Sequence, residues 1–248
     1  ALFEKITDKI LTMNIESSEM VKHGINSFLA MSIVFADNLA DLCEETGADI
    51  SDVVSGLKSD PRIGNKSYLS PGIGFSGGTL GRDLKVLDEV NEKVTNSTGW
   101  FGYIHEYNRR RKNTIVNKIS KHSAGLAGRT IGVLGLTYKP GTSTLRRSLP
   151  LEIVNQLVEK SANVRVYDPK ADYSELSFEP KFIIVKNIRE LSINADILVL
   201  LTEWPRFKKF NWPTIRDSMK TPIIFDAKNF LIGEELKEIG FNYYSIGR

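Results

Sequence analysis

The residues best suited to chemistry gather in a glycine-rich stretch at positions 71–83, which reads Pro-Gly-Ile-Gly-Phe-Ser-Gly-Gly-Thr-Leu-Gly-Arg-Asp. Glycine has no Cβ, so such a stretch brings its backbone close to a ligand. A helical pattern follows at once, and the start of a helix presents unpaired N–H groups and a positive dipole end to an anion such as phosphate. Glycine-rich runs are more often flexible linkers, but Phe75, Thr79 and Asp83 within this one favour an ordered site.

A second candidate site is the basic loop at positions 135–148, which follows an apolar run and precedes a helical pattern. It carries Lys139, Arg146 and Arg147, and cations at the end of a strand suit a phosphate-bearing ligand. The loop lacks the G-x-G-x-x-G spacing of the dinucleotide fingerprint. An ordinary exposed basic loop fits the composition equally well, so both interpretations stay open.

Alternating β and α patterns must position this basic loop. The apolar run 130–135, the helical pattern 149–160 and the run 164–167 form a β-α-β unit. This alternation predicts an open, mostly parallel sheet, in which ligands bind beyond the carboxyl ends of the strands. Further short β patterns occur at 182–185, 197–201, 223–226 and 243–246. The loops at which a ligand is expected are 136–147, 202–210 and 226–229.

The first half of the chain is predicted to be helical. Apolar residues recur at helical spacing through 17–46, with Ser17 or Ser18 as the N-cap and Gly47 as the residue that ends the helix. A helix this long, apolar on more than one side, is typical of a bundle or a subunit interface. Shorter helices are expected at 49–57, 80–94 and 100–122.

Two features of the helical half have ordinary structural explanations. Cys43 follows the apolar pattern of its helix, which favours buried packing over reactivity. The run Arg-Arg-Arg-Lys at 109–112 lies on a predicted helix, where a basic run is most often a solvated face. Its alternatives are contact with a phosphate or with an acidic partner subunit.

Composition excludes several classes of protein. The 248 residues are 41% hydrophobic and 25% charged, as in a soluble globular protein of one or two domains. A formal net charge of +3 is too small to indicate binding to nucleic acid or an anionic membrane. Three histidines and one cysteine, none in a ligand-like spacing, give a metal site little support. The single cysteine excludes an internal disulfide framework and fits a cytoplasmic protein. No signal peptide and no apolar run of about 18 residues is visible.

Several motifs in chain order resemble the UDP-glucose/GDP-mannose dehydrogenase family, the nucleotide-sugar 6-dehydrogenases. Each motif is weak alone, but together and in order they are specific, and the match runs from about residue 16 to 248. The motifs lie at 18–26 (Ser-Glu-Met-Val-Lys-His-Gly-Ile-Asn), 60–64 (Asp-Pro-Arg-Ile-Gly), 71–83, 132–146 (from Gly-Val-Leu-Gly-Leu-Thr-Tyr-Lys-Pro to Arg), 201–204 (Leu-Thr-Glu-Trp), 225–229 (Phe-Asp-Ala-Lys-Asn) and 244–247 (Tyr-Ser-Ile-Gly).

The resemblance implies an architecture. Residues 1–125 are expected to be a helical central domain that carries the active-site loop and dimerises through the helix 17–46. Residues 126–248 are expected to be a Rossmann-like α/β domain that binds a UDP-sugar. Family members also have an N-terminal NAD-binding domain, which is expected to precede Ala1 and to be absent from this chain, because the sequence begins in what reads as mid-domain.

The resemblance also implies a reaction. Family members oxidise the C6 alcohol of the sugar to a carboxylate in two hydride transfers to NAD, through a thioester on a cysteine. Lys22 and Asn26 match the family lysine and asparagine that hold water and stabilise an oxyanion, and their i, i+4 spacing puts them on one helix face. Asp83 matches the aspartate that assists hydrolysis. Thr79 occupies the cysteine position, and a threonine hydroxyl needs an adjacent base to become nucleophilic.

Ligand-binding residues follow from the same motifs. Arg146 matches an arginine that reaches toward the cofactor phosphates. Lys228 stands where family members often carry an arginine that reaches the sugar from a neighbouring subunit, and a lysine there makes a point-charge contact. The positions expected to bind the nucleotide sugar are Tyr68, Leu69, Gly72, Phe75, Gly77, Tyr138, Lys139 and Lys228.

Two hypotheses of different classes remain. The first is part of an NAD-dependent UDP-sugar 6-dehydrogenase involved in polysaccharide biosynthesis, in which Thr79 makes the four-electron oxidation doubtful. The second is a non-catalytic nucleotide-sugar-binding and dimerisation module. The missing cysteine favours the second hypothesis, and the retained Lys22, Asn26 and Asp83 favour the first. The sequence leaves the nucleotide and the sugar undecided.

Overall fold

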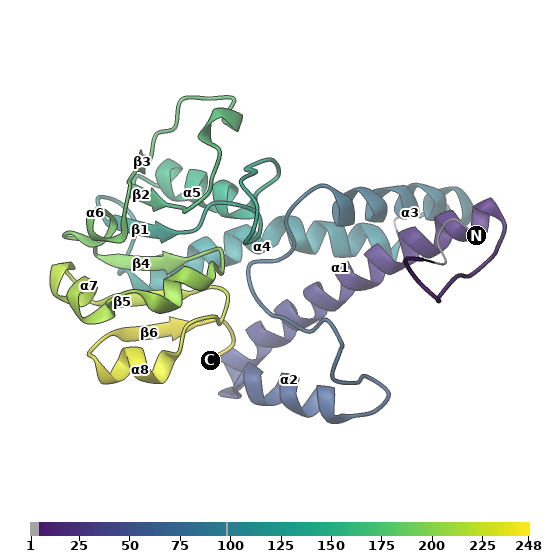
Figure 1. Ribbon diagram of the computed structural model, residues 1–248, viewed down its shortest axis with the longest axis horizontal. Helices are drawn as coiled ribbons and strands as arrows, with labels where there is room; N and C mark the ends of the chain where they lie inside the picture. The colour runs from purple at the N-terminus through teal and green to yellow at the C-terminus, as the bar shows by residue number, and fades with distance from the viewer. Residues whose placement is uncertain (1–4, 98) are drawn as a thin grey trace.

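The protein has a helical part and an α/β part, and its computed structural model describes residues 5–97 and 99–248 (Figure 1). The predicted domain 1–125 therefore includes residues 1–4 and 98, which lie outside the described residues. The helical part contains α1 (Ile15–Thr46), α2 (Ile50–Ser59), α3 (Thr79–Thr95) and α4 (Trp100–His122). The strands are β1 (Thr130–Leu134), β2 (Asn163–Tyr167), β3 (Ile183–Ile184), β4 (Ile197–Leu200), β5 (Ile223–Asp226) and β6 (Asn242–Ser245). Between them lie α5 (Leu149–Glu159), α6 (Ile188–Ser192), α7 (Trp212–Ser218), α8 (Gly233–Glu238) and the 3₁₀ turns η1 (Tyr173–Glu175) and η2 (Pro205–Lys209).

The strands form one parallel sheet in the order β3-β2-β1-β4-β5-β6. This confirms the predicted Rossmann-like, mostly parallel sheet. Every residue of β4 is buried, as its uninterrupted apolar run predicts for a central parallel strand. The strand order reverses between β1 and β4, and ligands of such sheets bind beyond the carboxyl ends of the strands at that reversal.

Helices cover both faces of the sheet (Figure 1). On one face α5 and the C-terminal half of α4 pack against the strands. On the other face Leu191 of α6, Ile215 of α7 and Leu236 of α8 pack with Leu134 and Leu198. The carboxyl end of β6 meets the helical part, where the Ile50 N–H of α2 donates to the Gly247 carbonyl at 3.0 Å.

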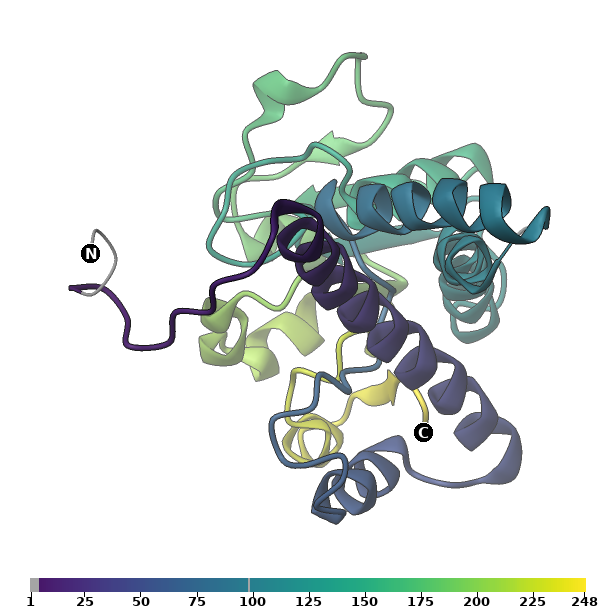
Figure 2. The same ribbon diagram turned by 90° about the vertical axis from the view of Figure 1, so that its right-hand side faces the viewer.

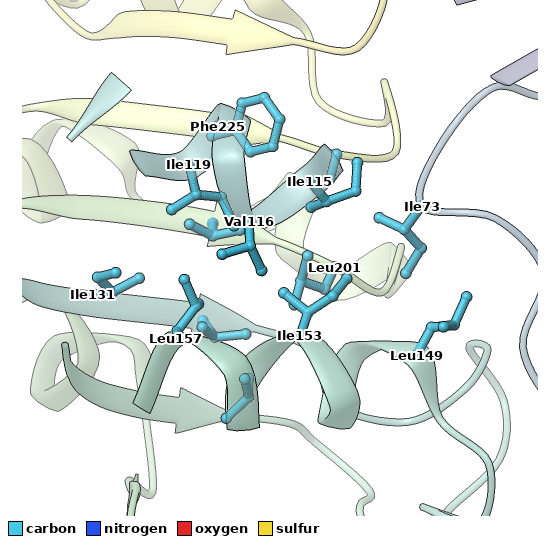
Figure 3. Packing of buried hydrophobic residues seen from close by; sticks show 14 of the residues in the cluster. Ile73, Ile115, Val116, Ile119, Ile131, Leu149, Ile153, Leu157, Leu201 and Phe225 are labelled. Carbon is cyan, nitrogen blue, oxygen red and sulfur yellow. The ribbon is translucent and has the colours of Figure 1, made fainter. Parts of the chain in front are cut away.

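One hydrophobic core joins the two parts of the chain. In Figure 3, Ile115, Val116 and Ile119 of α4 lie against residues of the sheet and of α5. Ile73, from the glycine-rich stretch, belongs to the same cluster and is buried. The predicted boundary between residues 125 and 126 falls in the turn after α4, but the core continues across it.

The helix α1 is long, and half of its most apolar segment is buried. The Asn14 side chain caps it by accepting a hydrogen bond from the Ser17 backbone N–H at 2.9 Å, so the cap precedes the predicted Ser17 or Ser18. Gly47 ends the helix with φ of 76°. Contrary to the expectation from the sequence, α1 contains a window long and apolar enough to cross a membrane by length and composition, with mean hydropathy 1.2. Half of that window is buried against the rest of the protein, and the core helix of a globular protein can have the same properties.

Candidate active site

The glycine-rich stretch is an ordered loop between α2 and α3. Gly74 has φ of +94°, and a Cβ there would lie 2.4 Å from Oδ1 of Asn108 on α4. The Asn108 side-chain amide makes two hydrogen bonds to the backbone of Phe75. Its Oδ1 accepts from the Phe75 N–H at 2.8 Å, and its Nδ2 donates to the Phe75 carbonyl at 3.0 Å. Glycine is therefore required at position 74 so that the loop can approach α4.

A buried ion network holds the start of this loop. The Gly72 N–H donates to Oδ1 of Asp37 at 2.6 Å, and Nε of Arg111 donates to the Gly72 carbonyl at 3.0 Å. Arg111 also pairs with Asp41 at 2.5 Å. Burial raises the pKa of Asp37, and the Arg111 charge and the Gly72 N–H offset this only in part, so the pKa stands at about 6.

This network corrects the interpretation of the basic run 109–112 as a solvated face. Arg109 and Arg110 do pair with Glu106 on the surface, but Arg111 is only 1% exposed. Arg111 follows Asn108 by three residues and precedes Ile115 by four, which places it on the buried face of α4. That spacing could have predicted the burial of Arg111 from the sequence, but the four consecutive cations suggested an exposed face instead.

The glycine-rich loop is also hydrogen-bonded to the basic loop after β1. The Gly77 N–H donates to the Arg147 carbonyl at 2.9 Å, and the Leu149 N–H donates to Oγ of Ser76 at 3.1 Å. The Arg147 guanidinium reaches back to the Gly78 carbonyl at 3.3 Å. The two loops singled out in the sequence are thus fastened together at the start of α3 and of α5.

An open cleft of about 740 Å³ lies where the two loops meet. It brings together five of the predicted site residues, namely Gly77, Thr79, Tyr138, Lys139 and Arg146. Its remaining lining residues are Ser76, Gly78, Leu80, Thr144, Arg147 and Glu175. The basic side chains on its walls suit a phosphate-bearing ligand. Among the residues that the structure describes, no group of three or more His, Cys, Asp or Glu side chains forms a metal site.

A cluster of polar side chains lies between α1 and α3, one helical turn from Thr79. Nδ2 of Asn26 donates to Oδ2 of Asp83, and Nζ of Lys22 donates to Oδ1 of Asn26 at 3.4 Å. Nε of Arg82 donates to Oδ1 of Asp83 at 3.4 Å. Burial alone raises the pKa of Asp83, but the hydrogen bonds from Asn26 and Arg82 outweigh it, together with the nearby His23, and lower the pKa below its usual value. The structure therefore joins Lys22, Asn26 and Asp83 in one chain of contacts.

Four other predicted binding residues lie away from this cleft. Phe75 is 7% exposed and packs with Ile104 in the core of the helical part. Leu69 lines a separate apolar cavity of about 300 Å³. The preceding residue, Tyr68, is exposed. Gly72 lies at the buried ion network, where its backbone is held by Asp37 and Arg111. Contact of these residues with a ligand stays a prediction.

Lys228 lies at the end of β5 and packs against the glycine-rich loop. A Cβ at Gly72 would lie 3.7 Å from Nζ of Lys228. The same Nζ lies 3.4 Å from Oε2 of Glu203, at the end of β4. Asp226 shapes this turn by accepting from the Lys228 N–H at 2.9 Å. The loop after β5 thus places the Lys228 cation beside Gly72, and the loop after β4 pairs it with the Glu203 carboxylate.

Asp168, which directly follows β2, organises the loop after β1. Its Oδ2 accepts from the N–H groups of Leu136 at 2.7 Å and Thr137 at 3.0 Å, and from Nε1 of Trp204 at 3.1 Å. Because these donors come from the ends of β1 and β4, Asp168 fixes the loop that carries Tyr138 and Lys139. An Asp directly after a parallel strand was the available signal.

The fold and the site together define a class: a parallel nucleotide-binding sheet fastened to a helical domain, with a basic cleft at their junction. Residues 16–110 match the central-domain model of the UDP-glucose/GDP-mannose dehydrogenase family, and residues 132–232 match its UDP binding domain. The chain belongs to the UDP-glucose/GDP-mannose dehydrogenase family.

Relatives and solved structures agree with this assignment. The chain is 38% identical over 242 residues to a UDP-glucose 6-dehydrogenase of Rickettsia typhi, covering 96% of this chain and 56% of the relative. It is 33% identical over 248 residues to the UDP-glucose 6-dehydrogenase YwqF of Bacillus subtilis, covering 100% and 56%. A UDP-glucose dehydrogenase structure from Pyrobaculum islandicum superposes with a TM-score of 0.83 at 25% identity, covering 99% of this chain and 54% of that one. The chain thus spans about half the length of the relatives it matches.

Proposed function

We propose that this chain forms the catalytic-loop and nucleotide-sugar-binding part of an NAD-dependent UDP-sugar 6-dehydrogenase. The carrying observation is that one cleft joins the end of β1 to the start of α3, so that Lys139 and Thr79 face the same space. The Lys22, Asn26 and Asp83 contacts lie one helical turn further along α3. Relatives named UDP-glucose 6-dehydrogenase support a UDP-sugar as the substrate class.

The predicted site residues, in the cleft and beside it, have distinct roles in this proposal. Lys139 and Tyr138 hold the nucleotide, and Gly77 lines the same cleft beside the Tyr138 ring. Lys22 and Asn26 hold a water or the sugar hydroxyl, and Asp83 fixes Asn26. The remaining predicted contacts of the nucleotide sugar are Tyr68, Leu69, Gly72, Phe75 and Lys228.

The cofactor in this proposal is NAD, which accepts hydride when bound. Arg146 lines the cleft and is exposed, so its guanidinium fits a cofactor phosphate. Thr79 stands at the first position of α3, beside Arg146 in the cleft wall. The residues of this chain thus bind and orient the substrate and present one cation to the cofactor.

Thr79 limits the proposed oxidation to two electrons. A threonine hydroxyl stays protonated near neutral pH and forms no thioester, so the covalent route to a carboxylate is closed. The expected product is the sugar aldehyde, with one NADH formed per sugar. The test is to titrate the full-length protein with UDP-glucose, UDP-N-acetylmannosamine and GDP-mannose, with and without NAD, following heat and NADH absorbance. Two NADH per sugar, or a covalent sugar adduct on Thr79 by intact mass, would contradict the two-electron proposal.

The second candidate is a non-catalytic module that binds a nucleotide sugar and dimerises. The exposed Thr79 in place of a nucleophilic cysteine favours it. The same titration separates the two candidates, because the module releases heat with a UDP-sugar but forms no NADH. The dehydrogenase forms NADH with at least one of the sugars.

We also propose a homodimer through residues 17–46. Val21, Phe28, Phe35 and Leu42 recur every seven residues along α1 and are each between 47% and 61% exposed. In Figure 2 no described element lies between the viewer and α1, while α3 and α4 pack against other sides of it. An apolar seven-residue repeat is the pattern by which helices pair, and a second copy offers the same stripe. A cytoplasmic location, without nucleic acid or membrane as partners, completes this proposal.

A further inference from the structure

His23 and Asp83 face each other across the contact between α1 and α3. Nδ1 of His23 lies 3.6 Å from Oδ1 of Asp83. Asp83 is 1% exposed, and its other oxygen is held by Asn26. The structure thus places a histidine beside the predicted catalytic aspartate, although no histidine stands within the glycine-rich stretch.

The two edges of the His23 ring have different surroundings. Nδ1 is enclosed and, among the described residues, has no hydrogen-bond partner, with Oδ1 of Asp83 just beyond hydrogen-bond distance, whereas 28% of the side chain remains exposed. The edge that carries Nε2 is therefore on the solvent side. A carboxylate opposite Nδ1 favours the tautomer with the proton on Nδ1, which leaves the Nε2 lone pair free to accept a proton.

We propose that His23 is the general base of this site, held by Asp83, and that it takes the proton of the sugar hydroxyl during oxidation. The inference rests on the proposed function and deepens it. The hydroxyl O–H bond breaks toward Nε2, the C–H bond breaks with its electron pair moving to the nicotinamide of NAD as hydride, and a C=O bond forms. The products are an aldehyde, NADH and an imidazolium, whose proton then leaves to water from the exposed edge.

The other polar groups around this turn are poorer bases. Asp83 is buried and has both oxygens engaged, by Asn26 and by Arg82, which stabilise its ionised form and make it weakly basic. Lys22 and Arg82 act as hydrogen-bond donors in this cluster, to Asn26 and Asp83 respectively. Imidazole changes protonation between about pH 5 and 8, which suits an acceptor at neutral pH.

One other histidine lies close to this turn of α3 and offers a matched control. His105, on α4, has Nε2 3.8 Å from the position of a Cβ at Gly81. The charged group that faces His23 is Asp83 on α3, which Arg82 also contacts, and Lys22 precedes His23 on α1.

The kinetic test compares His23→Gln with His105→Gln in the full-length protein. His23→Gln is expected to lower kcat about 100-fold with KM for the UDP-sugar nearly unchanged, since general bases contribute about 10² to 10⁴ in rate. It should also remove the acid limb of the kcat-against-pH profile, and imidazole in the buffer should restore part of the rate. His105→Gln should keep the rate within about threefold and retain the limb. A His23→Gln protein that keeps both its rate and its acid limb overturns the proposal.

A second test needs no activity. The full-length protein labelled with ¹⁵N-histidine reports the tautomer of each ring by NMR, with assignment by the two glutamine variants. The proposal expects the Nδ1–H tautomer for His23 and a larger share of the Nε2–H tautomer in Asp83→Asn, because the variant removes the facing negative charge. An Nε2–H tautomer in the wild type, or a tautomer balance that does not change in the variant, overturns the His23–Asp83 pair. If the wild-type protein forms no NADH with any sugar, the proposed function fails, and this measurement still decides the pair. His23→Asn serves where His23→Gln does not fold.

Discussion

Arg111 donates a hydrogen bond through Nε to the carbonyl oxygen of Gly72 at 3.0 Å, from inside the helical part of the protein. The guanidinium is almost fully buried and is neutralised by Asp37 and Asp41. A buried cation therefore anchors the loop that forms one wall of the cleft, and the loop depends for its position on the charge balance of α1 and α4.

Removing the Arg111 cation should destabilise the protein. Arg111→Met leaves Asp37 buried without its partner, which is expected to lower the free energy of unfolding by about 3 kcal/mol. Urea unfolding followed by circular dichroism measures the change. The control is Arg110→Met, whose arginine pairs with Glu106 on the surface, and its effect should stay within about 0.5 kcal/mol. Equal effects of the two variants would contradict the anchoring role.

Asp37 should make stability depend on pH between about 4 and 6. Burial raises its folded-state pKa from 3.8 to about 6, so the folded protein binds more protons than the unfolded chain in this window. The contribution of Asp37 to stability is therefore greatest below pH 4 and declines as the pH rises through 6. Urea midpoints of the wild type and Asp37→Asn, measured from pH 4 to 7, should show the wild type losing stability relative to the variant. A constant difference between the two would contradict the raised pKa.

A thiol at position 79 should open the covalent route. Thr79 is the first residue of α3 and is exposed, so Thr79→Cys fits without repacking, and the helix start favours a thiolate. The full-length Thr79→Cys protein is expected to form up to two NADH per UDP-sugar. Its intact mass is expected to show a covalent sugar adduct on the thiol introduced at position 79. Thr79→Ser is the matched control and should stay at the wild-type stoichiometry. Identical stoichiometry in all three proteins would count against the proposed loop chemistry.

Lys139 should contribute to nucleotide binding. It is exposed and lines the cleft beside Tyr138, so Lys139→Ala removes a cation from the ligand without disturbing the core. Calorimetric titration with UDP should show binding weaker by about tenfold, equivalent to about 1.4 kcal/mol. Lys181, an exposed lysine before β3, provides the control Lys181→Ala, which should leave the affinity unchanged. Unaltered binding in Lys139→Ala would remove this residue from the site.

A charge in the apolar stripe of α1 should separate the proposed dimer. Phe35→Asp places a carboxylate at the centre of the seven-residue repeat, where an interface would desolvate it. Light scattering after gel filtration is expected to give the monomer mass for this variant and the dimer mass for the wild type. Phe178→Asp, at an exposed phenylalanine outside α1, should remain dimeric. A dimeric Phe35→Asp protein would place the interface elsewhere.

Much of the α/β part could be predicted because its signals are local. The run at 197–200 is continuously apolar and forms a fully buried central strand. The pattern at 182–185 was less informative, since only Ile183 and Ile184 pair with β2 and both are exposed at the edge of the sheet. An edge strand buries little surface, so its length depends on neighbours that a local pattern does not contain.

The candidate site could be predicted only in part because it depends on contacts between distant segments. Motif spacing found Lys22, Asn26 and Asp83, which the packing of α1 on α3 then brings together. His23 was missed because its significance comes from facing Asp83, 60 positions away in the sequence. Arg111 was missed because Arg109 and Arg110 beside it are ordinary surface cations, and the burial of Arg111 depends on tertiary packing.

The core shared by α4 and the sheet has a mechanical consequence. Because Ile115, Val116 and Ile119 pack between β1 and α5, the helical part and the α/β part are expected to move as one body, with no hinge between them. Both walls of the cleft are fixed to this body, one through Arg111 and the other through Asp168. A nucleotide sugar therefore meets a preorganised surface, and little of its binding free energy is lost in ordering the two walls.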